Sequence, residues 1–263
     1  FLDRLQPGSA FYNVPSMVRL AGALDVPALE RSLGEVVRRH EALRTTFREK
    51  DGTPVQVIAP FRGFSLPVED LSSPAGDERD ARMRRRAAEE GARPFDLAEG
   101  PLFRAVLLRL ADDDYVLLLC IHHIVADEWS LGVLFAEMWQ LYGAFREGGE
   151  SPLPELPAQY ADYVAWQRQA LQGEPLERQL AWWKTRLAGA PALLELPTDH
   201  PRPAVQTYRG ASERMLLPAG LLDALHELRR SEGATLFMVL LAAFQVLLAR
   251  YSGTDDIVVG SPI

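Results

Sequence analysis

Hydrophobic positions along this chain follow two different periods, and the changes of period predict an alternation of strands and helices. Residues 115–121 read Y-V-L-L-L-C-I, a continuous apolar run typical of a strand buried on both faces. From Leu131 to Phe145, apolar residues recur every three or four positions, which predicts an amphipathic helix packed against a core. A similar pattern begins at Pro27, a residue suited to the first turn of a helix, and places His40 on the packed face as a core histidine.

The first half of the chain carries most of the strand signals. Short apolar segments are expected to form strands at 16–21, 44–48, 54–59, 102–110 and 115–121. Asp51-Gly52 separates the second and third of these segments, and because this pair tolerates the positive φ values of a tight turn, it predicts a hairpin. The triplet Asp112-Asp113-Asp114 joins the last two segments and is expected to be a solvated turn, not a metal site.

The second half of the chain carries more helix signals. Helices are expected at 159–171, 176–187, 219–231 and 235–250, and strands at 212–217 and 257–259. Residues 191–203 contain four prolines, which predicts an extended linker and the main domain boundary. The uncharged run 234–249 falls short of the roughly 20 residues that span a bilayer, so we expect a buried helix there. Strands mixed with helices in this way indicate an α/β sandwich.

The segment richest in chemistry runs from His122 to Ser130, between the buried strand and the amphipathic helix. Successive side chains of a strand point to opposite faces, so His122 and His123 are expected to face different surroundings. Asp127 or Ser130 is expected to cap the helix. Residue types alone favour a structural turn over a reaction centre. Zinc is disfavoured and no metal is expected, because the H-E-x-x-H spacing is missing and the other histidines do not cluster with the pair.

Several motifs together favour a reaction centre over a purely structural turn. Residues 122–127, H-H-x-x-x-D, resemble the signature of the condensation domains of nonribosomal peptide synthetases. Residues 39–47 are similar to that family's R-H-E-x-L-R-T-x-F segment, and residues 160–166 to its Y-x-D-Y-x-x-W segment. P-F-D-L at 94–97 and G-P-L-F-R at 100–104 also fit. The motifs occur in the family's order, and the resemblance extends along the whole chain.

The resemblance implies a chloramphenicol acetyltransferase-like fold. In that fold two similar lobes, each an α/β sandwich of two layers, form a V-shaped pseudo-dimer with a tunnel between them. Residues 1–190 are then expected to form the N-terminal lobe with the H-H-x-x-x-D motif, 191–203 the linker, and 204–263 the start of a truncated C-terminal lobe. The beginning of the family's first motif and its later F-V-N-T segment do not occur in the sequence, so we expect a fragment that is inactive alone.

The resemblance also implies a reaction and its residues. The reaction is attack of an acceptor aminoacyl amine on a donor thioester, which forms an amide and extends a peptide. His123 matches the catalytic position, and His122, Asp127 and Arg44 are expected to support the motif. We expect an ion pair between Arg44 and Asp127, because a guanidinium can donate two parallel hydrogen bonds to one carboxylate. Three further residues are candidates for lining the tunnel: Glu128, Trp129 and Ser130.

The residues after Asp127 bear on the branch of the family. Glu128 stands where many members have Gly, so it adds bulk and charge beside the expected acceptor channel. Trp129-Ser130 resembles the condensing branch more than the epimerising one, and an L-configured donor is favoured. His122 argues against the cyclising branch, in which Asp replaces the first histidine.

The implied partners are donor and acceptor peptidyl carrier domains, whose phosphopantetheine arms carry both substrates, and an adenylation domain of the same polypeptide. We expect no cofactor bound by the domain itself. The net charge of −8 argues against nucleic acid as a partner, and no membrane association is expected. Cys120 is the only cysteine, which excludes an intramolecular disulfide, predicts a cytoplasmic setting, and suits a small apolar filler of the core.

Two other functions remain open. An acyltransferase that uses a soluble CoA thioester and a small alcohol or amine would share His123 and Asp127, but its D-F-G-W-G segment is not in this sequence. A carrier-docking module without catalytic activity is expected to lose its active-site residues, whereas His122, His123, Asp127 and Arg44 are all retained. Arginines and acidic residues interleave over 77–90, which favours a solvated helix face over a docking patch for an acidic partner.

Overall fold

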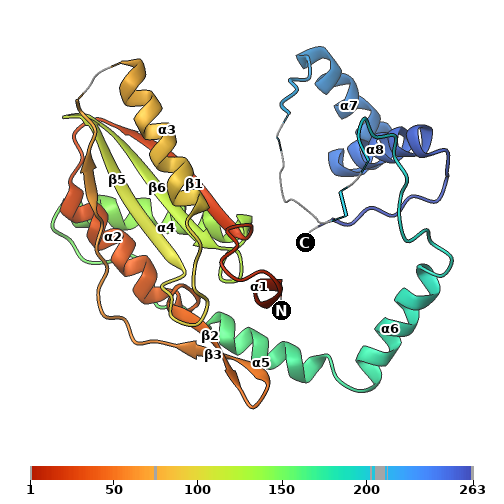
Figure 1. Cartoon of the computed structure of the whole chain (residues 1–263), viewed down its shortest axis with the longest axis horizontal. Helices are drawn as coiled ribbons and strands as arrows, with labels where there is room; N and C mark the ends of the chain where they lie inside the picture. Colours follow the sequence, from red (N-terminus) through yellow and green to blue (C-terminus); the bar gives the residue numbers. More distant parts are fainter. Residues whose placement is uncertain (1, 74–75, 202, 205–210, 212, 262–263) are drawn as a thin grey trace. The chain divides into compact units, whose positions relative to one another are not determined.

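The computed structural model describes residues 2–73, 76–201, 203–204, 211 and 213–261 (Figure 1). The chain divides into two compact units, Phe1–Ala170 and Leu171–Ile263. This division lies before the predicted boundary at 190, because helix α6 (Glu174–Arg186) contains no buried residue that would tie it to the first unit. The assignment of the two units to family lobes stays a prediction.

The first unit contains a mixed four-stranded sheet in the order β1-β6-β5-β4. Its strands are β1 (Asn13–Ala21), β4 (Val68–Asp70), β5 (Phe103–Ala111) and β6 (Asp114–His122). β6 pairs antiparallel with both β1 and β5, and β4 pairs parallel with β5. A separate hairpin joins β2 (Thr45–Lys50) to β3 (Thr53–Ile58). Both predicted hairpins are confirmed, and the first turns at Asp51, which has a φ of 53° and is followed by Gly52.

Helices cover both faces of this sheet. α2 (Val26–Arg39) and α4 (Glu128–Arg146) pack against each other and against one face, while α3 (Asp77–Ala92) lies over the other (Figure 1). The unit also contains α1 (Leu2–Leu5), the short 3-10 helix η1 (Glu41–Arg44) and α5 (Tyr160–Ala170). The predicted α/β architecture is therefore confirmed.

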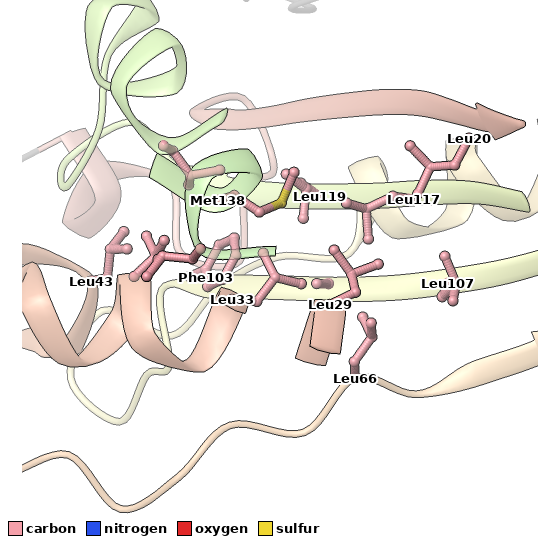
Figure 2. Close-up of a cluster of buried hydrophobic side chains, with 14 of the residues drawn as sticks. Leu20, Leu29, Leu33, Leu43, Leu66, Phe103, Leu107, Leu117, Leu119 and Met138 are labelled. Carbon is pink, nitrogen blue, oxygen red and sulfur yellow. The ribbon is translucent and has the colours of Figure 1, made fainter. Parts of the chain in front are cut away.

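The core follows from the period-two pattern of β5 and β6. Phe103, Leu107, Leu117 and Leu119 point toward α2 and α4, where they meet side chains such as Met138 (Figure 2). The alternate positions, among them Leu108 and Leu118, point toward α3. Burying a leucine or methionine side chain completely contributes about 1.5 to 3 kcal/mol to the stability of the fold. Because β6 is buried on both faces, it is a rigid support for the turn that follows it.

Cys120 lies in the same strand, packed with Phe95 and Leu102. The Cys120 side chain is fully buried, and burial raises the pKa of its thiol. The prediction of a small apolar filler is confirmed. The prediction that His40 lies in the core is wrong. His40 follows α2 as its C-cap with an extended backbone (φ −97°, ψ 99°), so it no longer continues the packed face of the helix, and its side chain is 26% exposed.

The second unit contains α6, α7 (Ala219–Ser231) and α8 (Leu236–Ser252), close to the predicted helix positions. The prediction of a buried helix at 234–249 is wrong, because α8 has no buried residue. The strands expected at 212–217 and 257–259 are wrong for the described residues 213–217 and 257–259, which lie in irregular structure. A strand requires a hydrogen-bonded neighbour, and no described segment pairs with either of them. None of the described helices is long and apolar enough to cross a membrane singly. Only α7 and α8 taken together, as a pair bent by 104°, have the length and composition of a membrane span.

Candidate active site

The site lies at the turn that leads from β6 into α4. His122 is the last residue of the strand, and α4 begins at Glu128. The backbone amide of His122 donates to the carbonyl oxygen of Leu102 at 3.0 Å, and that of His123 donates to the carbonyl oxygen of Tyr12 at 2.8 Å. Two neighbouring segments therefore fix the backbone of the histidine pair.

His122 points into the protein. Its side chain is buried, and Nδ1 accepts a hydrogen bond from the backbone amide of Ile124 at 3.1 Å. The rings of Tyr12 and Phe95 lie beside it, with centroids 6.1 and 6.0 Å away. Burial lowers the pKa of His122, because the charged imidazolium would lose its hydration. This ring therefore holds the turn together as a neutral group.

His123 points outward into a pocket of about 350 Å³. None of the described residues forms a hydrogen bond with the His123 ring. The pocket walls are mostly apolar: Val36, Leu43, Ile121, Val125, Val133 and Leu134. The prediction that the two consecutive histidines face different surroundings is confirmed.

Asp127 caps α4. Its Oδ1 accepts from the backbone amide of Ser130 at 2.8 Å and from the Ser130 hydroxyl at 2.6 Å. The Asp127 amide donates back to the Ser130 oxygen at 3.3 Å, which completes a reciprocal capping box. The Ser130 hydroxyl and amide lower the pKa of Asp127, so this carboxylate is ionised at neutral pH. Asp127 or Ser130 was expected to cap the helix; Asp127 is the N-cap, and Ser130 completes the capping box from the first turn of α4.

The predicted ion pair between Arg44 and Asp127 is wrong. Arg44 Nη1 donates to the carbonyl oxygen of Ala59 at 2.6 Å, and Nη2 donates to the Glu41 carboxylate at 3.2 Å. Arg44 closes η1 and turns toward the end of β3, while the oxygens of Asp127 are directed at the start of α4. Arg44 thus fixes the segment beside the pocket without touching the motif.

The three candidate tunnel residues behave differently. Trp129 and Ser130 line the pocket, and the Trp129 side chain is 83% exposed. Glu128 is exposed and does not line the pocket. Its effect on an acceptor channel therefore stays a prediction.

Sequence reasoning missed two further residues of the pocket wall. Tyr160 lines the pocket from α5, whose start is anchored where Gln159 Nε2 donates to the carbonyl oxygen of Arg39 at 2.8 Å. His40 also lines the pocket, and its Nε2 lies 2.7 Å from a carboxylate oxygen of Glu137 on α4. Both residues belong to motifs recognised in the sequence, but nothing in their spacing indicates that they meet His123.

Known proteins match this sequence along its whole length. The family model described as "Condensation domain" matches residues 1–263. The chain is 56% identical over 263 residues to one of the proteins that make up linear gramicidin synthase in Brevibacillus parabrevis, covering 100% of this chain and 3% of that protein. It is 44% identical over 263 residues to phosphinothricin tripeptide synthetase PhsC of Streptomyces viridochromogenes, covering 100% of this chain and 24% of that protein.

Solved structures agree with the sequence comparison. The X-domain from teicoplanin biosynthesis is 34% identical with a TM-score of 0.80, over 91% of this chain and 53% of that one. SgcC5 from Streptomyces globisporus is 36% identical with a TM-score of 0.72, over 93% and 55% of the two chains. The first condensation domain of the CDA synthetase is 22% identical with a TM-score of 0.77, over 96% and 60%, which shows the shared fold.

The chain therefore spans a small part of the curated synthetases and between half and two thirds of these solved chains. The family model covers every residue, the retained H-H-x-x-x-D turn opens onto a pocket, and the sheet and helices match the solved relatives. These findings agree on one conclusion: the chain belongs to the condensation-domain family of nonribosomal peptide synthetases.

Proposed function

We propose that this chain is the part of a condensation domain that carries the reaction centre for peptide-bond formation. The α-amine of an acceptor aminoacyl thioester attacks the carbonyl carbon of a donor thioester, the C–N bond forms and the C–S bond breaks. The observation that carries the proposal is the placement of His123, exposed in a pocket at the end of a rigid strand, next to a buried His122.

The pocket suits a reaction that depends on positioning. An α-amine with a pKa of about 7.7 to 8.0 is already roughly 10% unprotonated at pH 7, so its prior deprotonation contributes only about 1 to 1.4 kcal/mol. Aligning two reactants contributes about 7 to 11 kcal/mol. His123 therefore acts mainly as a hydrogen-bond partner that orients the reacting groups.

Carrier-bound substrates fit the relatives, which are multidomain peptide synthetases. In the proposal, the donor and acceptor groups arrive on phosphopantetheine arms of two carrier domains, and an adenylation domain of the same polypeptide supplies activated amino acids. The domain needs no cofactor of its own. The reaction takes place in the cytoplasm.

The test is single-turnover transfer by the full-length domain with two loaded carrier proteins, followed by mass spectrometry of the intact acceptor carrier. We expect a dipeptidyl thioester on the acceptor carrier, and no comparable product when the same donor acyl group is supplied on CoA. Equal transfer from CoA to a free amine would instead support a soluble-thioester acyltransferase.

A docking function is the second candidate, and one observation favours it. A solved relative at 34% identity is described as a complex of the X-domain and OxyB from teicoplanin biosynthesis, with a TM-score of 0.81. The same experiment separates the two functions, because carrier binding without any dipeptidyl product would support docking.

A further inference from the structure

The pocket is lined by a second histidine, His40, whose ring forms a hydrogen bond with a carboxylate. His40 lies where α2 ends, and its Nε2 is 2.7 Å from Oε2 of Glu137. The His40 side chain is 26% exposed and the Glu137 side chain 13% exposed, so the contact is largely shielded from water. Hydrogen bonds between a carboxylate and an imidazole are strengthened in such surroundings.

Glu137 is itself held in place. Nε of Arg39, whose side chain is only 2% exposed, donates to the same Oε2 at 3.3 Å, and Arg39 Nη1 donates to the carbonyl oxygen of Pro154 at 2.8 Å. Burial alone would raise the pKa of Glu137, but the hydrogen bonds from His40 and Arg39 outweigh it and hold that pKa below its ordinary value. Glu137 is therefore a carboxylate, and it accepts the Nε2–H of His40.

That contact determines the other nitrogen of the ring. When the Nε2–H of a neutral histidine is bound to a carboxylate, Nδ1 carries a lone pair. No described protein group forms a hydrogen bond with Nδ1 of His40, and the ring lines the 350 Å³ pocket that His123 also lines. The other ionisable groups around this ring are His123, Asp127 and Tyr160, which line the same pocket, Arg39, which shares the Glu137 oxygen, and Glu41 at the start of η1.

His40 and His123 thus differ in a way that matters for proton transfer. A histidine backed by a carboxylate has a fixed tautomer and orientation, and the carboxylate stabilises the imidazolium that forms when the ring accepts a proton. His40 has this arrangement, whereas the His123 ring has no carboxylate bonded to it among the described residues. The better-prepared proton acceptor in the pocket is therefore not the histidine of the H-H-x-x-x-D signature.

We propose that His40, oriented by Glu137, is a second catalytic residue of this pocket and accepts the proton that the acceptor amine loses during peptide-bond formation. The inference rests on the proposed function. After attack, the new C–N bond leaves a positive charge on nitrogen; Nδ1 of His40 takes that proton, the C–S bond then breaks, and the thiolate leaves with its electron pair. Solvent later accepts this proton from His40, which returns the ring to its starting state for the next turnover.

His40→Gln separates this role from a purely structural one. The amide nitrogen of glutamine lies near the position of Nε2 and can still donate to Glu137, but the variant has no group at the Nδ1 position that accepts a proton. We expect the single-turnover rate of the full-length domain with two loaded carriers to fall by about 10²-fold at neutral pH, with an unchanged unfolding midpoint. The deficit is expected to shrink at higher pH, where solvent accepts the proton more readily.

Two matched variants complete the test. Glu137→Gln keeps a hydrogen-bond acceptor for His40 but removes the charge, so we expect a lower rate with the same pH trend. Arg38→Gln removes ion pairs to Glu35 and Glu155 from the same helix without touching Glu137 or the pocket, so we expect a rate and a pH profile like those of wild type.

The outcomes are distinguishable. A His40→Gln rate equal to wild type, or a loss equal at all pH values, would show that the His40–Glu137 contact is only a structural tie and would overturn the inference. Absence of product from the wild-type domain would instead contradict the proposed function itself.

Discussion

Two apolar helices of this chain, α4 and α8, show how differently the same kind of sequence can be used. Both are long and rich in leucine, but α4 buries Leu134, Met138, Leu141 and Phe145, whereas α8 buries none of its residues. α4 packs against α2 and a sheet, and α8 contacts α7. Apolar periodicity thus specifies a helix, but only a packed partner makes that helix a rigid support. The candidate site lies at the turn that leads into the packed helix.

Leu141→Ala and Leu247→Ala test the difference between the two helices most directly. Leu141 is fully buried on α4 and Leu247 is 51% exposed on α8. We expect the first change to lower the free energy of unfolding by about 2 to 5 kcal/mol, because it leaves a cavity, and the second by less than about 0.5 kcal/mol. Urea unfolding measures both, and equal losses would show that α8 is packed in solution.

His122→Ala tests whether the first histidine is part of the packed support. The change removes a buried ring and its hydrogen bond to the amide of Ile124. We expect a loss of about 2 to 3 kcal/mol in the free energy of unfolding. A variant as stable as wild type would contradict a structural role for His122.

Asp127→Ala and Asp127→Asn test the capping box. We expect alanine to cost about 1 kcal/mol of stability and asparagine much less, because asparagine is also a good N-cap. The folded-state pKa of Asp127 is lowered, so its contribution to stability is present above the ordinary pKa of about 3.9 and is lost as the pH falls through the lower folded value. Unfolding midpoints at neutral and acidic pH check both points; equal stability of the two variants would contradict the cap.

A smaller effect is expected from the protonation of His122. Because burial lowers its folded-state pKa, the unfolded chain binds a proton more readily, and stability is lost as the pH falls below about 6.5 toward the folded value. Urea midpoints at about pH 7.5 and about pH 5.5 measure the loss. His122→Ala is expected to show a smaller difference between the two, and an unchanged difference would assign the effect to other groups.

Much of this fold could be predicted from the sequence, because its elements are defined locally. The run 115–121 and the periodic residues of α4 specify a buried strand followed by a helix, and Asp51-Gly52 specifies a turn. The strands expected at 212–217 and 257–259 were wrong for their described residues, because pairing depends on a neighbour that local pattern does not contain.

The candidate site, like the fold, could be predicted from the sequence only in part. The opposed directions of His122 and His123 follow from strand geometry, and the cap at Asp127 follows from residue type. The partner of Arg44 was predicted wrongly, because a long side chain near η1 has several acceptors within reach and the carbonyl of Ala59 is one of them. The His40–Glu137 contact joins residues 97 positions apart, and only the packing of α2 against α4 brings them together.

The most direct test of the account is the single-turnover rate of His123→Ala in the full-length domain, measured with two loaded carrier proteins beside wild type and His122→Ala. The account predicts that His123→Ala folds with a wild-type unfolding midpoint but forms dipeptidyl thioester about 10²- to 10⁴-fold more slowly. It also predicts that the folded fraction of His122→Ala retains more of the rate. A His123→Ala domain that forms product at the wild-type rate would contradict the assignment of His123 to the reaction centre.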